Sequence, residues 1–554
     1  MSICHHIQDI IRFVCWTIPI ILLWDGIRLL CFVICLLPGF IQFAYYYFIT
    51  SNRTSQRYGH DSCRQTMDIY YSKLHYNATH SINDRRDDDH EDQKNDDDIE
   101  NGNENSIRRP PVVSSHDNEE EGQSSIRCEL KPVIVFYTGG AWIIGYKMWG
   151  TLLGRILNSD ACGNLVVVIP DVRNYSPWAT VPDMIDDCDT SLEWIFQNIH
   201  RYGGDPNNIV LVGQSAGGHI ACTTILQKAM KNNNNMVRRF EHHRQQRTKS
   251  REEDELIITL DENDDNDDNN GNGYDDSSSS SSSWKPTDLK GFISLSAPYS
   301  LTAMKQTFMK HGLDESLVVR IFGVTSDSGG SYGDNFDDEE GIIDRDYDLE
   351  QNGNDDTSIP NIGTRGGDLL DLYDPYAIVR KYNNNISGCR SATNTNNDTS
   401  MHENSNSLSK YLPPIKIFHG THDKTVPYDG SVMFYQELVK ATTTPTTTCT
   451  NTQNITFASY DGWSHTDPIL EGPMDADHRF HRDIFESVKE WTTTAAAATT
   501  VTTITTEVTT TSTSTPLDDQ TLQVGGEWPE NDPIIVRRLC PHVLIQIGRY
   551  CNPF

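Results

Sequence analysis

The segment 213–218, with the sequence Gly-Gln-Ser-Ala-Gly-Gly, constrains the fold of this 554-residue chain more than any other feature. An apolar run, 209–212, precedes it, and a run of helical character, 219–226, follows it. A serine flanked by glycines between a strand and a helix is typical of a nucleophile elbow, a tight turn that projects the serine hydroxyl from the sheet edge. The positive end of the following helix favours negative charge that develops nearby. We therefore interpret Ser215 as a candidate nucleophile.

Short apolar segments, which we predict to be strands, alternate with segments of helical periodicity along much of the chain. This alternation predicts an α/β fold, in which a mostly parallel sheet is covered by helices on both faces. In such sheets the ligand site lies at the carboxyl ends of the strands. The expected strands are 66–71, 133–137, 165–169, 209–212, 291–296, 415–418 and 455–459, and the expected helices are 183–200, 219–226, 432–440 and 477–491.

The loops after the last two expected strands carry the partners that a nucleophilic serine needs. An ester-cleaving serine requires a general base and an acid that orients the base. In proteins with this elbow, the chain order is serine, acid, histidine. Asp423 and His465 follow their strands in that order, so we predict them to be the acid and the base. The alternative for Asp423 is an aspartate that caps the next helix, and His419 and His422 are interpreted as loop-shaping hydrogen-bond donors.

A glycine pair directly after the strand 133–137 is a candidate oxyanion hole, within the sequence Thr138-Gly139-Gly140-Ala141-Trp142. Paired glycines free backbone N–H groups to point at a carbonyl oxygen. Together with the N–H of Ala216 they would stabilise a tetrahedral intermediate. The alternative is an ordinary glycine turn. No residue cluster has metal-ligand spacing, and the expected chemistry needs neither a metal nor a cofactor.

The N-terminal region predicts a membrane anchor, which we place at residues 1–55. Residues 29–50 form a run of 22 residues without a charge, ending in tyrosines that suit a membrane interface. A shorter apolar run at about 10–24 is a candidate second span, which would give a helical hairpin. A cleaved signal peptide is the alternative, but the apolar stretch is too long and no small-residue cleavage site follows.

The remainder is expected to be one hydrolase-type domain, 56–492, a Thr-rich linker, 493–528, and an amphipathic C-terminal segment, 529–554. The formal net charge of −33 argues against a nucleic-acid-binding protein, which needs a basic face. The acidity gathers in polar, low-complexity segments that we predict to be disordered inserts. These inserts are 77–127, 231–284, 325–367, 383–409 and 441–454.

Several strings resemble the isoprenylcysteine methylesterase family, membrane-bound α/β-hydrolases related to the hormone-sensitive-lipase-like esterases. The longest is Val-Phe-Tyr-Thr-Gly-Gly-Ala-Trp-Ile-Ile-Gly-Tyr-Lys at 135–147. Related esterases usually carry histidine where Thr138 stands, so this string narrows the resemblance to the one family. The other matching segments are 37–42, 202–206, 213–219 and the closing Asn-Pro-Phe at 552–554.

The resemblance implies an α/β-hydrolase fold with an N-terminal transmembrane segment. It also implies hydrolysis of the α-carboxyl methyl ester of prenylated cysteine at endoplasmic reticulum or Golgi membranes. The partners would be the membrane and prenylated, carboxyl-methylated proteins. Ser215, Asp423 and His465 would form the catalytic triad. The residues that would line the oxyanion and substrate site are Gly139, Gly140, Ala141, Gln214 and Ala216.

Two other functions are compatible with the same residues. One is a general lipid or xenobiotic carboxylesterase of the same fold. The other is an inactive hydrolase-like membrane scaffold that binds through its acidic inserts. The long inserts and the Thr-rich linker depart from the family pattern, and the sequence assigns them no role.

Overall fold

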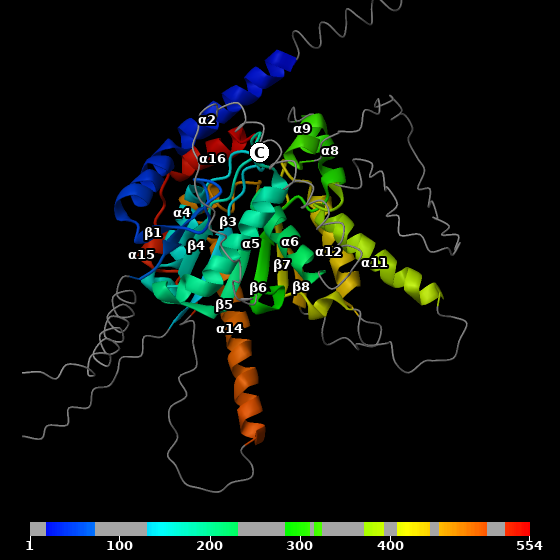
Figure 1. Cartoon of the computed structure of the whole chain (residues 1–554). Coiled ribbons are helices and arrows are strands. Elements are labelled where there is room, and N and C mark those ends of the chain that lie inside the picture. The colour runs from blue at the N-terminus through cyan, green and yellow to red at the C-terminus, as the bar shows by residue number, and fades with distance from the viewer. Residues whose placement is uncertain are drawn as a thin grey trace, which may run out of the picture.

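The computed structural model describes residues 18–72, 130–230, 283–310, 315–323, 370–392, 407–443, 454–506 and 527–553. The expected inserts 77–127 and 325–367 lie outside the described residues, as do nearly all of 231–284 and residues 1–17 of the expected anchor. Within the described part, the chain builds a central sheet with helices on both faces (Figure 1).

The sheet has eight strands in the spatial order β1-β2-β4-β3-β5-β6-β7-β8. β2 runs antiparallel to both of its neighbours, and all pairs from β4 through β8 are parallel. This confirms the mostly parallel sheet predicted from the alternation. The strands are β1 (Arg53–Arg57), β2 (Thr66–Tyr70), β3 (Lys131–Tyr137), β4 (Val166–Pro170), β5 (Gly204–Gln214), β6 (Gly291–Leu295), β7 (Ile415–Gly420) and β8 (Ile455–Tyr460).

The strand expected to come first, 66–71, is preceded by β1, which the sequence analysis missed. β1 reads Arg-Thr-Ser-Gln-Arg, so it has no apolar run to mark it. It is an edge strand, held by antiparallel backbone pairing with β2 and half exposed. It also begins inside the segment 1–55 that was expected to form the anchor, so that segment runs directly into the sheet.

Alternating side chains of the strands pack into two apolar layers. On one face the sheet packs against α5 (Val181–Asn198), α6 (Ala216–Ala229), α11 (Pro375–Ala392) and α12 (Tyr428–Thr442). On the other face it packs against α4 (Thr151–Leu157), α14 (Arg479–Thr506) and α15 (Pro533–Val536). Two further helices, α8 (Leu301–Lys310) and α9 (Glu315–Ile321), lie at the upper end of the molecule in Figure 1.

Two helices run further than the sequence suggested. α11 includes residues 383–392, which were expected to start an insert, and Asn383 Nδ2 donates hydrogen bonds to the backbone and side chain of Glu437 on α12. α14 continues to Thr506, into the expected Thr-rich linker. A helix already packed on the sheet extends easily through a run of alanines, which have the highest helix propensity.

The N-terminal helix α2 (Ile18–Tyr45) is continuous and passes into a short π-helical turn, Tyr46–Thr50. It therefore forms no hairpin turn between the two apolar runs, contrary to the expectation. α2 lies alongside α16 (His542–Cys551) at one side of the domain (Figure 1). Phe32, Leu36 and Ile545 are buried in a third apolar cluster that includes Met474 of α13 (Glu471–Met474).

Candidate active site

Ser215 lies in a sharp turn between β5 and α6, as the elbow pattern predicts. Its backbone has φ 54° and ψ −126°, a conformation that costs energy for a residue with a side chain. A Cβ atom on Gly217 would lie 2.3 Å from the carbonyl oxygen of Tyr137, and one on Gly213 would lie 2.6 Å from the Cα of Gly218. The flanking glycines are thus required because strand, turn and helix pass at backbone contact.

The sheet register brings the other predicted elements to the same edge. Tyr137 at the end of β3 pairs with Gly213 of β5, so the loop after β3 lies beside Ser215. Gly420 of β7 pairs with Tyr460 of β8, so the loops after these strands are also neighbours. Because the strands are parallel, their carboxyl ends meet at one edge of the sheet.

The three predicted side chains form a continuous hydrogen-bonded chain. His465 Nε2 lies 2.8 Å from Ser215 Oγ, and His465 Nδ1 lies 2.7 Å from Asp423 Oδ2. The carboxylate accepts a hydrogen bond from Nδ1–H, which leaves Nε2 free to accept the proton of the serine hydroxyl. Ser215 and His465 are buried, with 6% and 7% of their surface exposed. This is the arrangement that a general base and its orienting acid require.

The Asp423 carboxylate is fixed and kept ionised by its surroundings. Its Oδ1 accepts hydrogen bonds from the backbone N–H groups of Thr425 and Val426. Burial raises the pKa of this carboxyl, but attraction to His465 and hydrogen bonds from His419 and His465 outweigh burial and hold the pKa below its ordinary value. His419 is fully buried and pairs through Nδ1 with Ser431 Oγ at 2.7 Å, which fits the loop-shaping role expected for it.

The loop after β3 has positive φ angles at three consecutive residues, and its two glycines do not have the same role. Gly140 has φ 140°, and Ala141 and Trp142 have φ 49° and 61°. The N–H of Gly139, expected to face a substrate, instead donates to Gln214 Oε1 at 3.1 Å. The N–H groups of Gly140, Ala141 and Ala216 are the remaining candidate donors. Gly139 instead allows the loop backbone to pass close to Ser215, since a Cβ on Gly139 would lie 2.8 Å from the Cβ of Ser215.

Gln214, expected to line the site, bridges two of its loops. While its Oε1 accepts from Gly139, its Nε2 lies 3.4 Å from both Nε2 and the carbonyl oxygen of His465. The side chain is 2% exposed. Gln214 therefore ties the oxyanion loop to the base, a role that its place next to Ser215 in the sequence does not reveal.

A second buried relay, which the sequence analysis also missed, supports the oxyanion loop from behind. Trp142 Nε1–H donates to His219 Nδ1 at 3.3 Å, and His219 Nε2–H donates to the carbonyl oxygen of Tyr373 at 2.7 Å. Burial lowers the pKa of His219 to about 4, so the ring is neutral at physiological pH and can accept at one nitrogen while donating at the other. The loop is thus anchored to α6 and to the segment before α11.

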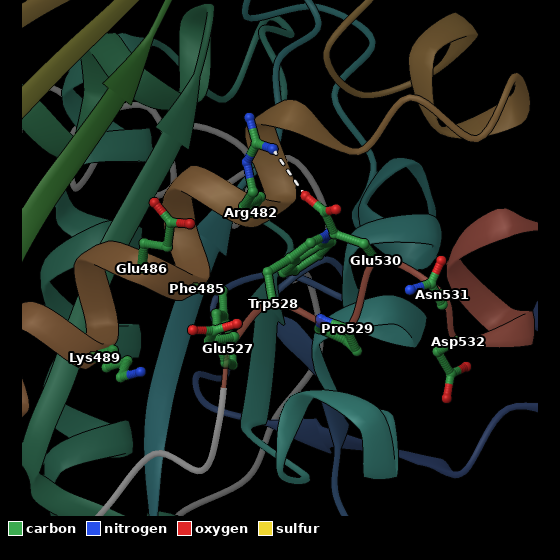
Figure 2. A pocket seen from close by; sticks show the side chains of 10 residues that line it. All are labelled: Arg482, Phe485, Glu486, Lys489, Glu527, Trp528, Pro529, Glu530, Asn531 and Asp532. Carbon is green, nitrogen blue, oxygen red and sulfur yellow. Dashed lines mark ion pairs between the residues drawn. The ribbon is translucent and has the colours of Figure 1, made fainter.

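An open hollow of about 860 Å³ lies elsewhere, between α14 and residues 527–532 (Figure 2). Arg482 and Glu530 pair across it at 3.7 Å. Ser215, His465 and Asp423 are not among the residues that line it, and neither is any other serine, cysteine or histidine. Across the described ranges, no group of three or more His, Cys, Asp or Glu residues is placed to hold a metal ion.

The chain is similar to several known proteins. A profile of the BD-FAE family matches residues 125–261, a range that contains the elbow. A solved structure titled as the apo form of Thermogutta terrifontis esterase 2 is 15% identical, with a TM-score of 0.38, covering 80% of this chain and 95% of that one. The order and directions of the eight strands, with the serine elbow after β5, define an α/β-hydrolase.

Curated relatives confirm the family resemblance. A probable isoprenylcysteine alpha-carbonyl methylesterase of Oryza sativa subsp. japonica is 25% identical over 81% of this chain and 65% of its own length. An isoprenylcysteine alpha-carbonyl methylesterase of Arabidopsis thaliana is 35% identical over 37% of this chain and 35% of its own length. A carboxylesterase, NlhH of Mycobacterium tuberculosis, is 34% identical over 16% of this chain. The chain spans less than two thirds of the length of the curated methylesterases that it matches.

Proposed function

We propose that this protein is a serine carboxylesterase in which Ser215 is the nucleophile, His465 the general base and Asp423 the orienting acid. The observation that carries the proposal is the unbroken chain of short hydrogen bonds, 2.8 Å from Ser215 to His465 and 2.7 Å from His465 to Asp423, at the strand edge where ligands bind. The relatives named as carboxylesterases and methylesterases support the same reaction class.

The geometry accounts for each step of ester hydrolysis. His465 Nε2 takes the hydroxyl proton as Ser215 Oγ attacks the ester carbonyl, and Asp423 stabilises the resulting imidazolium. The carbonyl oxygen becomes negative and would accept hydrogen bonds from the N–H groups of Gly140, Ala141 and Ala216. Loss of one such donor typically costs about 2.7–4 kcal/mol of transition-state stabilisation. His465 then returns the proton to the departing alcohol, and water cleaves the acyl-enzyme by the same two proton transfers.

The substrate we propose is the α-carboxyl methyl ester of a prenylated cysteine, so the departing alcohol is methanol. The support is the name that the curated relatives carry. The sequence of residues 135–147 also resembles that family. Hydrolysis would restore a carboxylate at the end of a prenylated protein, which weakens its hold on a membrane. We propose the endoplasmic reticulum or Golgi as the location from the same resemblance.

We further propose that α2 attaches the enzyme to the membrane in which such a substrate resides. Gly26–Thr50 is long and apolar enough to cross a bilayer, with mean hydropathy 2.1, a test of length and composition alone. Along one stripe of α2, Leu30, Ile34 and Ile41 are each about 60% exposed, while the opposite side packs on the domain. Exposed apolar stripes of this extent mark membrane or protein contacts. An enzyme attached to the membrane meets a prenyl chain there at high local concentration.

Labelling with a fluorophosphonate probe tests the proposed nucleophile. We expect one adduct, at Ser215, and loss of both the adduct and ester hydrolysis in Ser215→Ala. That variant should unfold at the same temperature as the original protein, because the substitution removes one hydroxyl without changing the turn. Full ester hydrolysis by the folded variant would exclude Ser215 as the nucleophile. A wild-type protein that reacts with neither the probe nor esters would favour the alternative of an inactive hydrolase-like membrane scaffold.

A further inference from the structure

The extreme C-terminal part of the described chain reaches the loop that carries His465. Asn552 is 2% exposed, and its Nδ2 donates to Ser464 Oγ at 3.3 Å and to Thr466 Oγ1 at 3.0 Å. These two residues flank His465 in the sequence. Glu471 Oε1 lies 2.6 Å from the same nitrogen, so its two N–H groups are shared among three acceptors. Thr466 Oγ1 in turn donates to Glu471 Oε1 at 2.9 Å. One buried amide thus contacts the residues immediately before and after the candidate base.

A second contact from α16 fixes the same loop. Arg549, one turn before Asn552, donates through Nε to Asp467 Oδ1 at 2.7 Å. The other carboxylate oxygen of Asp467 accepts the backbone N–H of Ser464 at 2.8 Å. Asp467 is 2% exposed, so its pairing with Arg549 is shielded from water. The loop 464–467 is therefore bound to α16 and Asn552 through residues that precede and follow His465 in the sequence.

α16 is in turn held by the N-terminal helix. Arg28 of α2 donates through Nη2 to the backbone carbonyl of Asn552 at 2.9 Å. Leu36 of α2 and Ile545 of α16 are fully buried in the same apolar cluster. The two helices lie close together, since a Cβ on Gly548 of α16 would lie 3.7 Å from the Cβ of Cys35 of α2. In Figure 1, α16 lies beneath α2 along the same side of the domain. α16 is thus bound between the proposed membrane helix and the proposed base.

We propose that Asn552 is a positioning residue for His465, and that α2 maintains this position by holding α16 through Arg28. Asn552 does not touch the reacting atoms; it sets where Nε2 stands relative to Ser215 Oγ. A displacement of about 1 Å of a catalytic group can lower a rate by about 100-fold, so a loop tethered at three points has a direct effect on turnover. The inference rests on the proposed serine–histidine–aspartate function.

The test compares Asn552→Ala with Gln546→Ala, an exposed position on the same helix whose side chain lies beside His542. Both would be assayed in the full chain with a small soluble ester and with a fluorophosphonate, neither of which depends on a prenyl group. We expect Asn552→Ala to lower kcat and the rate of phosphonylation of Ser215 by at least about tenfold, with KM within about threefold. Gln546→Ala should match the original protein.

A purely structural role for Asn552 predicts a different result. It would lower the unfolding temperature, while the folded fraction would keep its kcat and its phosphonylation rate. Asn158→Ala, which removes a side-chain hydrogen bond to the Leu165 carbonyl, controls for a general loss of stability. We expect it to leave kcat unchanged.

Should Asn552→Ala fail to fold, Arg28→Ala tests the same link without altering the loop's own partners. We expect a smaller fall in kcat and phosphonylation in the same direction, partly restored in Arg28→Lys. The inference would be overturned if folded Asn552→Ala kept the original kcat and phosphonylation rate. If Asn552→Ala does not fold, the same result in Arg28→Ala would overturn it. The proposed function would survive either result, because it is tested separately by the reactivity of Ser215 in the original protein and by the activity of Ser215→Ala.

Discussion

Replacement of Gln214 by glutamate gives a sharp test of the bridge between the oxyanion loop and the base. Gln214→Glu keeps an oxygen at the position of Oε1, so the hydrogen bond from Gly139 N–H, 3.1 Å long, is retained. The amide Nε2, 3.4 Å from His465 Nε2, becomes a carboxylate oxygen. The change therefore alters the charge beside the base while preserving the shape of the site.

The expected effect follows from that distance. A carboxylate within about 4–6 Å of a titrating group typically favours its charged form strongly enough to move the titration by about 1–3 pH units. The imidazole of His465 would hold its proton to higher pH, and a protonated ring cannot accept the serine proton. The pH at which kcat/KM rises should therefore increase by about 1–3. At a fixed pH below the new midpoint, kcat/KM falls about tenfold, or about 1.4 kcal/mol, for each pH unit by which the midpoint has moved.

The assay is the pH dependence of kcat/KM for a small soluble ester. Gln227→Glu serves as the matched control, because this partly buried glutamine on α6 lies away from the triad, with its amide 3.4 Å from the Leu372 carbonyl. The control should leave the pH profile unchanged. A folded Gln214→Glu protein whose profile coincides with that of the original protein would refute the bridge and the reasoning from the 3.4 Å contact to His465.

Two further substitutions probe the charges around the site. Asp423→Asn should lower kcat by about 10⁴-fold, the magnitude measured for the equivalent change in chymotrypsin-type enzymes, because the amide can no longer hold the required histidine tautomer; a loss below tenfold in steady-state kinetics would contradict its role. Burial raises the pKa of Glu471 to about 8, so the folded protein retains a proton that the unfolded chain has lost between about pH 4.5 and 8. Stability should fall as pH rises through that window, and Glu471→Gln should flatten this slope in urea denaturation; equal slopes in the two proteins would disprove the assignment.

The meeting of the three candidate side chains could be predicted because each follows an apolar run that becomes a strand. Ser215, Asp423 and His465 appear in the expected chain order, and parallel strands bring their carboxyl ends to one edge. The candidate oxyanion loop could also be located, since Gly139 and Gly140 directly follow a strand, but the sequence did not show that the Gly139 N–H donates to Gln214. What these patterns encode is local: a strand, a turn and a type of side chain.

The supporting contacts were not predictable because they join residues far apart in the chain. Gln214 meets His465 251 positions away, and Asn552 meets Ser464 and Thr466 88 and 86 positions away. Nothing in the sequence around a buried amide indicates its partner. β1 escaped prediction because an edge strand held by backbone pairing needs no apolar pattern. The continuous α2 contradicted the expected hairpin because the charges of Asp25 and Arg28 fit within a helix without ending it.

The most direct test of the central claim is the ratio of kcat/KM for farnesylcysteine methyl ester to that for a short-chain acyl ester. It should be measured in the full chain in detergent or lipid, with Ser215→Ala as the blank. We expect a strong preference for the prenylcysteine methyl ester, with both activities abolished in the variant. Equal or lower efficiency toward the prenylated ester would contradict the substrate proposed and identify a general carboxylesterase.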